Sequence, residues 1–414
     1  MVKLIFHKNP ERIGGGITEL QSNGHRLIID MGADLPKSGS FSETREANPN
    51  INGVTSGTPD CDGVLISHYH GDHAGLLHYV LSNIPIYMSR ATRSVLRVVK
   101  VVLLRNHLGG VTDWEIEQLN KANLFTYADW GKPHQLGNFI VTPVRQDHSA
   151  YDALGFVIQV DNIKIFFTGD FRGHGYTGSK LVPMCQKYVG KVDYILCEGT
   201  MLSRPGEVLI SEPTLYFKAM TLCQKHKYVL VLASSTNIDT QVSFYRAARA
   251  TRKAFKVDDF QQQIYNELVA DRHSDIYDIE PTTEFCPNGM VLMVRASQQS
   301  FIEAFFKKYG QDTVLVYSMW HGYLEKNAKL RHLQELWGDR FVELHTSGHG
   351  HPMVIKQVVE VCSTPQTVVI PMHTESFASW KRLQIKQPIL KTVAGTAYDL
   401  SDHASLINVA KEEA

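Results

Sequence analysis

The sequence predicts an α/β protein with a layered, strand-rich body and a separate parallel-sheet unit. Eight short apolar segments, several of them separated by turn residues, dominate the first 200 residues. From about residue 205, amphipathic helices alternate with apolar strands, which is typical of a parallel sheet with its own helices. One more helix and strand follow after about residue 345, and we expect them to return to the first body.

The expected strands of the first body are short, apolar and rich in β-branched or aromatic residues. They cover residues 3–8, 25–32, 63–68, 84–89, 138–146, 153–160, 163–170 and 193–200. Two helices are expected among them, one opening at residue 71 and one over residues 90–105.

The second unit repeats a helix and strand alternation. Its expected helices cover residues 212–226, 239–255, 299–310 and 330–338, and its expected strands cover 228–235, 289–297 and 312–319. The return segment is expected to form a helix over 351–362 and a strand over 367–373. The chain has no internal repeat and no low-complexity segment.

Composition sets broad limits on the class of protein. A chain of 414 residues with 43% hydrophobic content suits two or three domains with a sizeable core. The 42 basic and 42 acidic residues balance, so any nucleic-acid footprint would be local. Six scattered cysteines without a CxxC pair indicate a reduced compartment. Neither a signal peptide nor an apolar run of membrane-spanning length is visible, so we expect a soluble cytoplasmic protein without a membrane partner.

Four metal-ligand side chains crowd into six positions directly after an apolar segment. They are His68, His70, Asp72 and His73, in the stretch "HYHGDH". Such groups are costly at the end of a buried strand unless something satisfies them. Imidazole and carboxylate together are ligands of zinc and similar divalent ions. A lone histidine would be assigned to a surface loop, but four donors in six residues favour a metal site.

Three further donors stand in the same context, at the ends of apolar strands. They are His148, Asp170 and His373. Seven donors are enough for two metal ions that share a bridging aspartate. Most other histidines, including His25 and His78, lack this setting and are expected to be structural or surface residues.

The order Asp30, "HYHGDH", His148 and Asp170 resembles the motif series of the metallo-β-lactamase fold. That fold is an αβ/βα sandwich with its metals at the sheet edge. Glu198, His349 in "HTSGHGH" and His373 in "IPMHTE" resemble the extra motifs of the β-CASP branch. Members of this branch include ribonuclease J and the cleavage and polyadenylation endonucleases.

The resemblance covers nearly the whole chain and implies its domain organisation. In the β-CASP branch, an α/β domain is inserted between the acidic motif and the "SGH" motif. We therefore expect residues 1–202 to be the first part of the metallo-β-lactamase domain. Residues 203–345 would be the inserted β-CASP domain, and residues 346–414 would be the return segment of the first domain.

The resemblance also implies roles for the donors. One ion would be held by His68, His70 and His148, and the other by Asp72, His73 and His373, with Asp170 bridging. Asp30 and Glu198 resemble carboxylates that orient ligands. Either of them alone would be assigned to an ordinary turn or strand end. Zinc is the expected ion at both positions, with manganese as the alternative.

Two such ions would lower the pKa of a shared water, and the hydroxide so formed would attack an electrophile. The ligands alone do not distinguish carbonyl carbon from phosphorus, but the β-CASP motifs favour a phosphodiester. His349 would then protonate the departing sugar oxygen, which leaves 5′-phosphate and 3′-hydroxyl ends as in the family. The expected catalytic set is therefore Asp72, His349, Glu198 and Asp30.

Two basic stripes at helical spacing are candidates for phosphate contacts. They are Arg90, Arg93, Arg97 and Lys100, and then Arg246, Arg249, Lys253 and Lys256. The solvated faces of amphipathic helices are the alternative. Ser234 and Ser235 in "ASSTN" offer hydroxyls to a phosphate, or belong to a segment that caps the next helix.

Three functions remain open at this point. The leading one is a two-metal ribonuclease, endonucleolytic or 5′-exonucleolytic, with DNA as the alternative polymer. The second is a hydrolase of small esters, thioesters or lactones, which would not need His349 or the inserted domain. The third is a non-catalytic nucleic-acid-binding relative, against which the complete ligand set argues. The stretch "VYSMWHGYL" replaces a Gly-rich segment of ribonuclease J, so cleavage mode and homodimer formation stay open.

Overall fold

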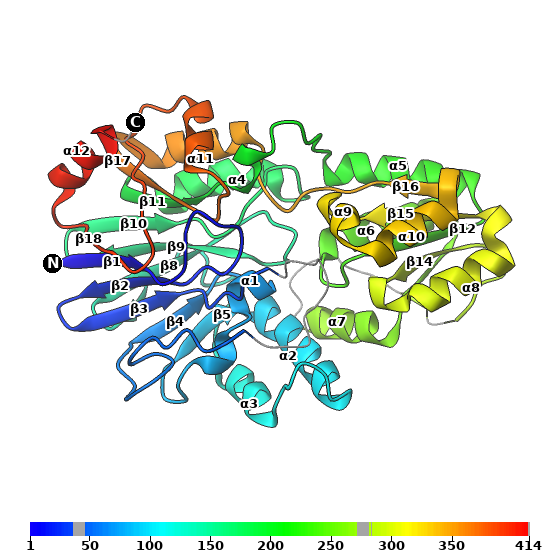
Figure 1. Ribbon diagram of the computed structural model, residues 1–414, viewed down its shortest axis with the longest axis horizontal. Helices are drawn as coiled ribbons and strands as arrows, with labels where there is room; N and C mark the ends of the chain where they lie inside the picture. Colours follow the sequence, from blue (N-terminus) through cyan, green and yellow to red (C-terminus); the bar gives the residue numbers. More distant parts are fainter. Residues whose placement is uncertain (36–45, 271–280, 283, 413–414) are drawn as a thin grey trace.

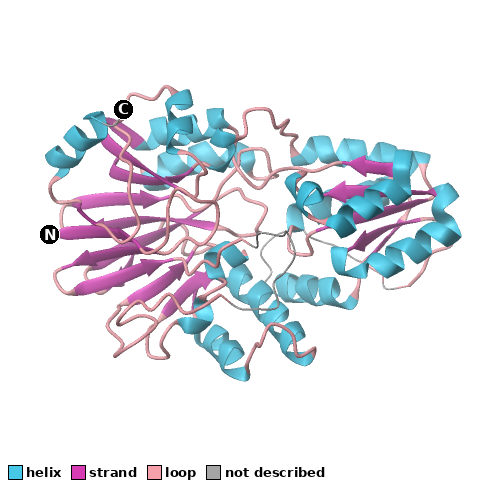
Figure 2. Cartoon of the chain, viewed as in Figure 1, coloured by secondary structure: helices cyan, strands magenta, loops and turns pink. Residues whose placement is uncertain are grey.

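The computed structural model describes residues 1–35, 46–270, 281–282 and 284–412. Two sheets pack face to face with helices on their outer sides, and a third sheet with its own helices lies beside them (Figure 1). Figure 2 shows the strands as two groups, the sandwich at the left and the smaller sheet at the right. The expected α/β class and αβ/βα sandwich are confirmed.

The first sheet has seven strands in the order β18-β1-β2-β3-β4-β5-β6. Its strands are β1 Val2–Phe6, β2 Thr18–Ser22, β3 His25–Ile29, β4 Gly63–Ile66, β5 Ile86–Ser89, β6 Asn123–Phe125 and β18 Ala397–Asp399. Helices α2 (Arg90–Arg105) and α3 (Asp113–Lys121) lie on its outer side. Leu65 faces the second sheet, whereas Val64 and Ile66 face the helices, as alternation along a strand requires.

The second sheet has six strands in the order β17-β11-β10-β9-β8-β7. Its strands are β7 His134–Leu136, β8 Phe139–Arg145, β9 Leu154–Val160, β10 Ile163–Phe167, β11 Val192–Glu198 and β17 Ser363–Met372. Helices α4 (Gly178–Met184) and α11 (Pro352–Cys362) cover its outer face. Strand β17 pairs in parallel with β11, so the segment that follows the third sheet returns to the sandwich.

The core of the sandwich lies between these two sheets. Leu65, Phe139, Phe156 and Tyr194 are among its fully buried side chains. Each fully buried aromatic or aliphatic side chain of this kind contributes about 1.5–3 kcal/mol. A well-packed core behind the strand ends gives the site residues described below a rigid support.

The third sheet is entirely parallel, with the order β13-β14-β12-β15-β16. Its strands are β12 Tyr228–Ala233, β13 Ala254–Lys256, β14 Met290–Val294, β15 Thr313–Ser318 and β16 Phe341–Glu343. One face packs on α5 Glu212–Lys225, α6 Ile238–Ala250 and α7 Asp259–Ala270, and the other on α8 Gln299–Tyr309, α9 Gly322–Lys326 and α10 Ala328–Trp337. We call this sheet and its helices the third-sheet unit.

Two expected helices are shorter in the structure. Helix α1 covers only Gly71–Ala74, because the backbone then turns so that Leu76 N donates to Met31 O. Helix α6 ends at Ala250, since Arg252 adopts a left-handed conformation with φ 57° and the chain continues into β13. Helix α12 (His403–Glu412) and strand β18 lie beyond the expected elements. Among the helices of the described residues, none combines the length and apolar character needed to cross a bilayer.

The third-sheet unit contacts the sandwich close to the "HYHGDH" loop. Tyr69 in this loop donates from its hydroxyl to Thr236 O at 2.7 Å and accepts from Tyr151 N at 2.7 Å. Ala150 and Asn237 form an isolated antiparallel bridge. The carboxyl end of β12 and the start of α6 therefore lie beside the loops that follow β4 and β8.

Candidate metal centre

The "HYHGDH" loop is anchored by Asp30, which follows β3. Asp30 has a left-handed backbone, with φ 62°, and is almost completely buried. Its carboxylate accepts from Ser67 N at 2.7 Å, from Ser67 Oγ at 2.9 Å and from His73 Nδ1 at 2.8 Å. Because Nδ1 of His73 carries the proton in this bond, its Nε2 is left as a ligand atom. This hydrogen bond to Asp30 restrains the orientation of the His73 ring.

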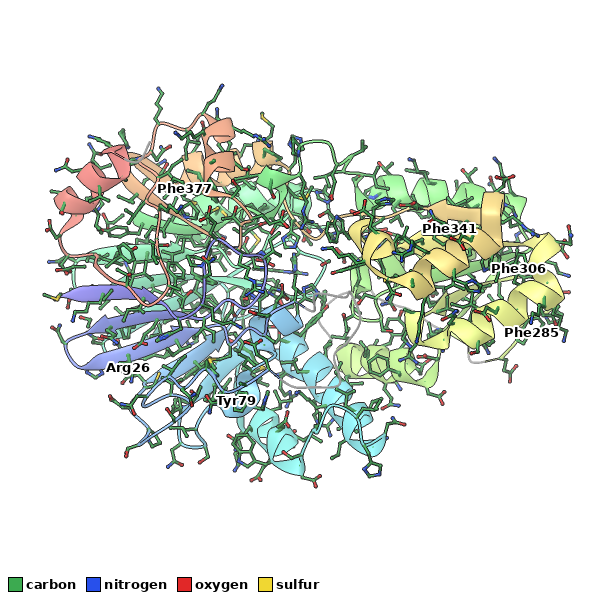
Figure 3. The ribbon with its side chains drawn as sticks, viewed as in Figure 1. Arg26, Tyr79, Phe285, Phe306, Phe341 and Phe377 are labelled. Atoms are coloured by element: carbon green, nitrogen blue, oxygen red, sulfur yellow. The ribbon has the colours of Figure 1, made fainter. Side chains whose placement is uncertain are left out.

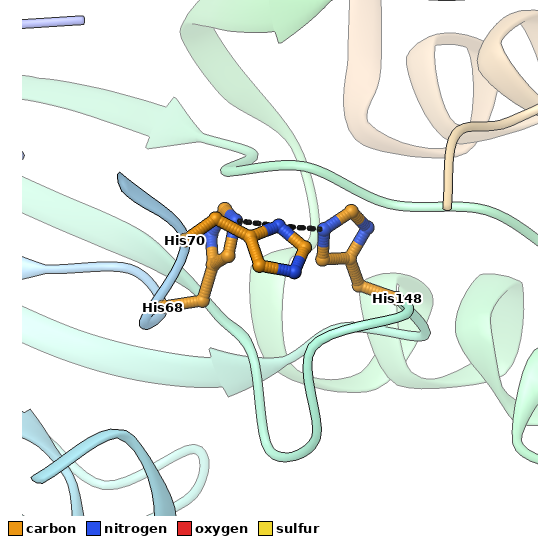
Figure 4. Close-up of side chains that lie close together, drawn as sticks. All are labelled: His68, His70 and His148. Atoms are coloured by element: carbon orange, nitrogen blue, oxygen red, sulfur yellow. Dashed lines mark hydrogen bonds between the residues drawn. The ribbon is translucent and has the colours of Figure 1, made fainter. Parts of the chain in front are cut away.

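Three imidazoles face one another at the first expected metal position (Figure 4). His68 Nε2 lies 3.1 Å from His70 Nδ1, which lies 3.3 Å from His148 Nε2. His148 donates from Nδ1 to the carbonyl oxygen of Gly348 at 2.6 Å, so its Nε2 has a free lone pair. Burial lowers the pKa of His70 to about 4, and burial with nearby imidazoles lowers the pKa values of His68 and His148. Neutral rings with converging nitrogens suit a bound cation.

The second expected position combines a carboxylate with two imidazoles. His373 Nε2 lies 3.2 Å from Asp72 Oδ2, and His73 Nε2 lies 3.9 Å from the same oxygen. Thr200 Oγ1 lies 2.9 Å from Nδ1 of His373 and fixes the other side of that ring. Strand pairing between β11 and β17 brings His373 to this place, because His373 directly follows β17.

Asp170 lies between the two donor sets. Its Oδ2 is 3.1 Å from His73 Nε2, 3.8 Å from His373 Nε2 and 4.0 Å from His68 Nε2. In the described part of the chain, Asp170 Oδ1 is buried without a hydrogen-bond partner. Buried polar atoms rarely lack a partner, and a cation would satisfy this one. The residues therefore fit two divalent ions.

His349 lies at the rim of the second donor set, next to Glu198. Its Nδ1 is 3.5 Å from Glu198 Oε2 and 3.8 Å from Asp170 Oδ2, and its ring stacks on that of His373. Glu198 is fully buried and accepts from Thr200 N at 2.9 Å. Burial opposes protonation of His349, but Glu198 and the neighbouring aspartates outweigh it and raise its pKa. His349 is also close enough to Asp170 and His373 to act as a ligand.

A buried ion cluster lies beneath the site, and no sequence pattern predicted it. Arg172 is completely buried, and its guanidinium donates to Asp239 at 2.6 Å, to Glu212 at 3.2 Å and to Ser347 O at 3.2 Å. Asp147 Oδ2 lies 3.7 Å from its Nε. Burial raises the pKa of Glu212 to about 7, although Arg172 opposes this shift. The partners are far apart in the sequence, so no local spacing marked them.

The two serines after β12 differ in their surroundings. Ser234 is exposed, and its Oγ lies 3.0 Å from that of Thr236. Ser235 is buried, and its hydroxyl has no hydrogen-bond partner among the described residues. Asn237 is the residue that caps α6, since its side chain accepts from Thr240 N at 3.3 Å. Neither serine therefore serves as the cap, and Ser235 keeps a free hydroxyl.

Two of the four residues of the first basic stripe form ion pairs with neighbouring helices. Arg97 pairs with Glu267 on α7 at 3.0 Å, and Lys100 pairs with Glu115 on α3 at 2.9 Å. Both contacts connect α2 to its neighbours and neutralise these two cations.

The second stripe is divided by the end of α6. Arg246 places its guanidinium over the ring of Tyr176 at 4.5 Å, and the exposed Arg249 lies on the same helix. Lys253 and Lys256 lie beyond the helix, and Lys253 donates to Lys227 O at 3.0 Å. Only Arg246 and Arg249 therefore share one helix.

A two-sheet sandwich with a histidine and aspartate centre at its strand ends defines a protein of the metallo-β-lactamase type. Residues 25–231, half of the chain, match the family described as the β-lactamase superfamily domain, and the chain belongs to that family.

Curated relatives carry ribonuclease names. "Endoribonuclease ysh1" of Emericella nidulans is 26% identical over 199 residues, which cover 45% of this chain and 21% of the relative. "Ribonuclease J 2" of Streptococcus pyogenes is 24% identical over 173 residues, with 41% and 29% covered. "Ribonuclease J" of Mycoplasma genitalium is 24% identical over 251 residues, with 57% and 41% covered. The chain thus spans less than half the length of these relatives, whose names are consistent with the β-CASP branch.

A solved structure resembles the whole chain. The crystal structure of a protein of unknown function from Enterococcus faecalis covers 96% of this chain and 99% of its own, with a TM-score of 0.73 and 17% identity. At this identity the similarity establishes the fold, including the arrangement of the third-sheet unit beside the sandwich, and nothing about activity.

Proposed function

We propose that the chain is a two-metal phosphodiesterase that cleaves RNA, with DNA as the alternative polymer. One ion would be held by His68, His70 and His148, and the other by Asp72, His73 and His373, with Asp170 shared between them. This convergence of donors from distant strand ends is the observation that carries the proposal. When bound, the ions would activate a water and screen charge on the phosphate. Imidazole-rich sets suit zinc, with manganese as the alternative.

The pair of His349 and Glu198 favours a phosphodiester over a small activated ester. A sugar alkoxide is a poor leaving group that benefits from a proton donor. Glu198 lies 3.5 Å from Nδ1 of His349 and would stabilise the doubly protonated ring. The proton on Nε2 would then go to the departing 3′ oxygen, which leaves a 5′-phosphate on the other product.

RNA is the preferred polymer because the curated relatives bear ribonuclease names. In this proposal, residues 203–345 form a β-CASP domain that borders the substrate path, and residues 1–202 and 346–414 form the metallo-β-lactamase domain. Arg246 and Arg249 would contact phosphates. Ser234 and Ser235 lie where α6 approaches the loop that carries His148, and would lie nearer the scissile phosphate.

The test is incubation of the metal-loaded protein with RNA labelled at the 5′ or the 3′ end. Product lengths over time separate internal cleavage from stepwise removal of nucleotides, and end-group analysis should find 5′-phosphates. Asp170→Asn serves as the inactive control. If the protein carries its ions and hydrolyses thioesters or lactones but neither RNA nor DNA, the small-ester alternative replaces this proposal.

A further inference from the structure

The amino ends of the third sheet lie at the edge of the molecule farthest from the sandwich. All five strands run in the same direction, so their amino ends meet at one edge. The opposite, carboxyl edge carries Asn237, which bridges to Ala150 beside the metal centre. Figure 3 places Phe285 and Phe306 at the end opposite the sandwich. The amino edge of the third sheet is therefore distant from the metal centre.

A cluster of aromatic rings lies at this amino edge, with Phe285 exposed and Tyr228 buried. Phe285 stacks on Tyr309 with ring centroids 5.5 Å apart and ring planes 25° apart. Tyr228, the first residue of β12, contacts both rings at 5.8 Å and 5.2 Å. Phe285 is 43% exposed, so one ring of this stacked cluster faces the solvent. Phe301, one turn before Phe305 on α8, is 45% exposed.

Lysines surround this aromatic cluster. Lys227 lies over the ring of Tyr228 at 5.4 Å, and Lys308 lies over the ring of Tyr309 at 5.0 Å. Lys225 and Lys253 lie close by, since burial and then these two lysines lower the pKa of His226. No salt bridge joins any of these four lysines to a carboxylate in the described part of the chain. Their positive charge is therefore free to act outward.

We propose that this surface binds a single-stranded segment of RNA. We call it the far-edge surface and define it as Lys225, Lys227, Tyr228, Lys253, Phe285, Lys308 and Tyr309. The inference rests on the proposed function, because it describes a second contact for the same polymer. A base would stack on Phe285, and the lysines would contact the adjoining phosphates. A polyanion with flat bases complements both these lysines and the exposed ring of Phe285.

The position of the far-edge surface predicts that only long substrates use it. Strand β12 has six residues, so the two edges of the sheet are about 20 Å apart. A dinucleotide bound at the metal centre cannot also reach Phe285. A long unstructured RNA can reach both places, and the additional contact would lower its KM.

The test compares the double variant Phe285→Ala, Lys308→Gln with a matched control, Phe217→Ala, Lys218→Gln. Phe217 is also exposed and is followed by a lysine, but it lies on α5, outside the far-edge surface. Binding of a long oligouridine should weaken about tenfold in the test variant, the usual effect of losing one stacked base. Its salt dependence should become shallower. The control should bind like the wild type.

Activity separates this inference from the proposed function. The test variant should show a raised KM for long RNA, with kcat and dinucleotide hydrolysis unchanged. Phe285→Leu keeps the apolar bulk without the ring, and its thermal midpoint shows whether the fold is intact. If a correctly folded variant binds long RNA like the wild type at every salt concentration, the far-edge surface is not an RNA site. Binding of RNA that depends on Phe285, without any cleavage, would reject the proposed function and keep this inference.

Discussion

The guanidinium of Arg172 donates to the carbonyl oxygen of Ser347 at 3.2 Å, from beneath the loop that carries His349. The same guanidinium binds Glu212 on α5 and Asp239 on α6. One buried arginine therefore connects the loop at the rim of the metal centre to two helices of the third-sheet unit. The carboxylates of Asp147, Glu212 and Asp239 lie within 3.7 Å of this guanidinium.

Replacement of Arg172 by Gln should lower the free energy of unfolding by about 3–5 kcal/mol, because three buried carboxylates would lose their cation. Denaturant unfolding of the metal-free protein measures this change. Arg12→Gln is the control, since Arg12 makes a partly exposed pair with Asp34 and should cost at most about 1 kcal/mol. A loss of the same small size for Arg172→Gln would show that the cluster is not ion-paired in solution.

Metal content should depend most strongly on Asp170, because it contacts both donor sets. We expect about two divalent ions per chain in protein purified without chelator. Asp170→Asn should lose occupancy at both positions, whereas Asp72→Ala should reduce the content to about one ion, since Asp72 belongs to one set alone. Elemental analysis gives the stoichiometry. Asp62→Asn, a change at a carboxylate that pairs with His25 instead, should retain both ions.

The basic stripe on α6 should affect RNA binding through charge. Changing Arg246 and Arg249 to alanine should weaken the affinity for RNA and flatten its dependence on salt, because fewer counterions are released. Binding measured over a range of salt concentrations tests this. Arg97→Ala and Lys100→Ala, which remove cations already paired with Glu267 and Glu115, should leave the slope unchanged.

Local sequence patterns predicted the parts of the structure that depend on neighbouring residues. Helix α2 covers residues 90–105 as expected, because its apolar face and Ser89 cap are encoded within one stretch. The donors at strand ends were predicted from local patterns too, since each follows an apolar run. Helix α1 was overestimated, because a contact between Leu76 and Met31 turns the chain.

Long-range contacts explain what the sequence could not predict. Arg172 pairs with residues 25, 40 and 67 positions away in the chain, so only the tertiary fold brings the cluster together. The pairing of Arg97 with Glu267 likewise depends on how α2 meets α7. Spacing along a helix identified the stripe, but it could not indicate which of its cations are already neutralised.

Protonation of the Glu19 carboxylate should lower the stability of the protein in acid. Burial opposes its ionisation, but hydrogen bonds with His7, Arg26 and Gln21 lower its pKa from 4.5 to about 2. A carboxylate whose folded pKa is depressed stabilises the fold above its unfolded pKa. The contribution of Glu19 should therefore be complete above about pH 4.5 and disappear as the pH falls towards 2.

The free energy of unfolding, measured between pH 2 and 6 for metal-free protein, tests this assignment. Glu19→Gln should be less stable than the wild type near pH 6, and the difference should shrink on acidification. A difference that stays constant over this range would mean that Glu19 acts through packing or neutral hydrogen bonds instead.

His349 gives the sharpest separation between a nuclease and a small-ester hydrolase. His349→Ala should keep both ions and still bind RNA, but its cleavage rate should fall by roughly 10²–10⁴-fold, the usual weight of one general acid. Activated aryl phosphodiesters should be hydrolysed almost normally, because their leaving groups depart without a proton. His351→Asn, in the same loop, keeps a side chain able to cap α11 and should behave like the wild type. An equal loss on RNA and on the aryl ester would instead identify His349 as a metal ligand or positioning residue, and full cleavage of RNA by His349→Ala would remove the proton-donor role.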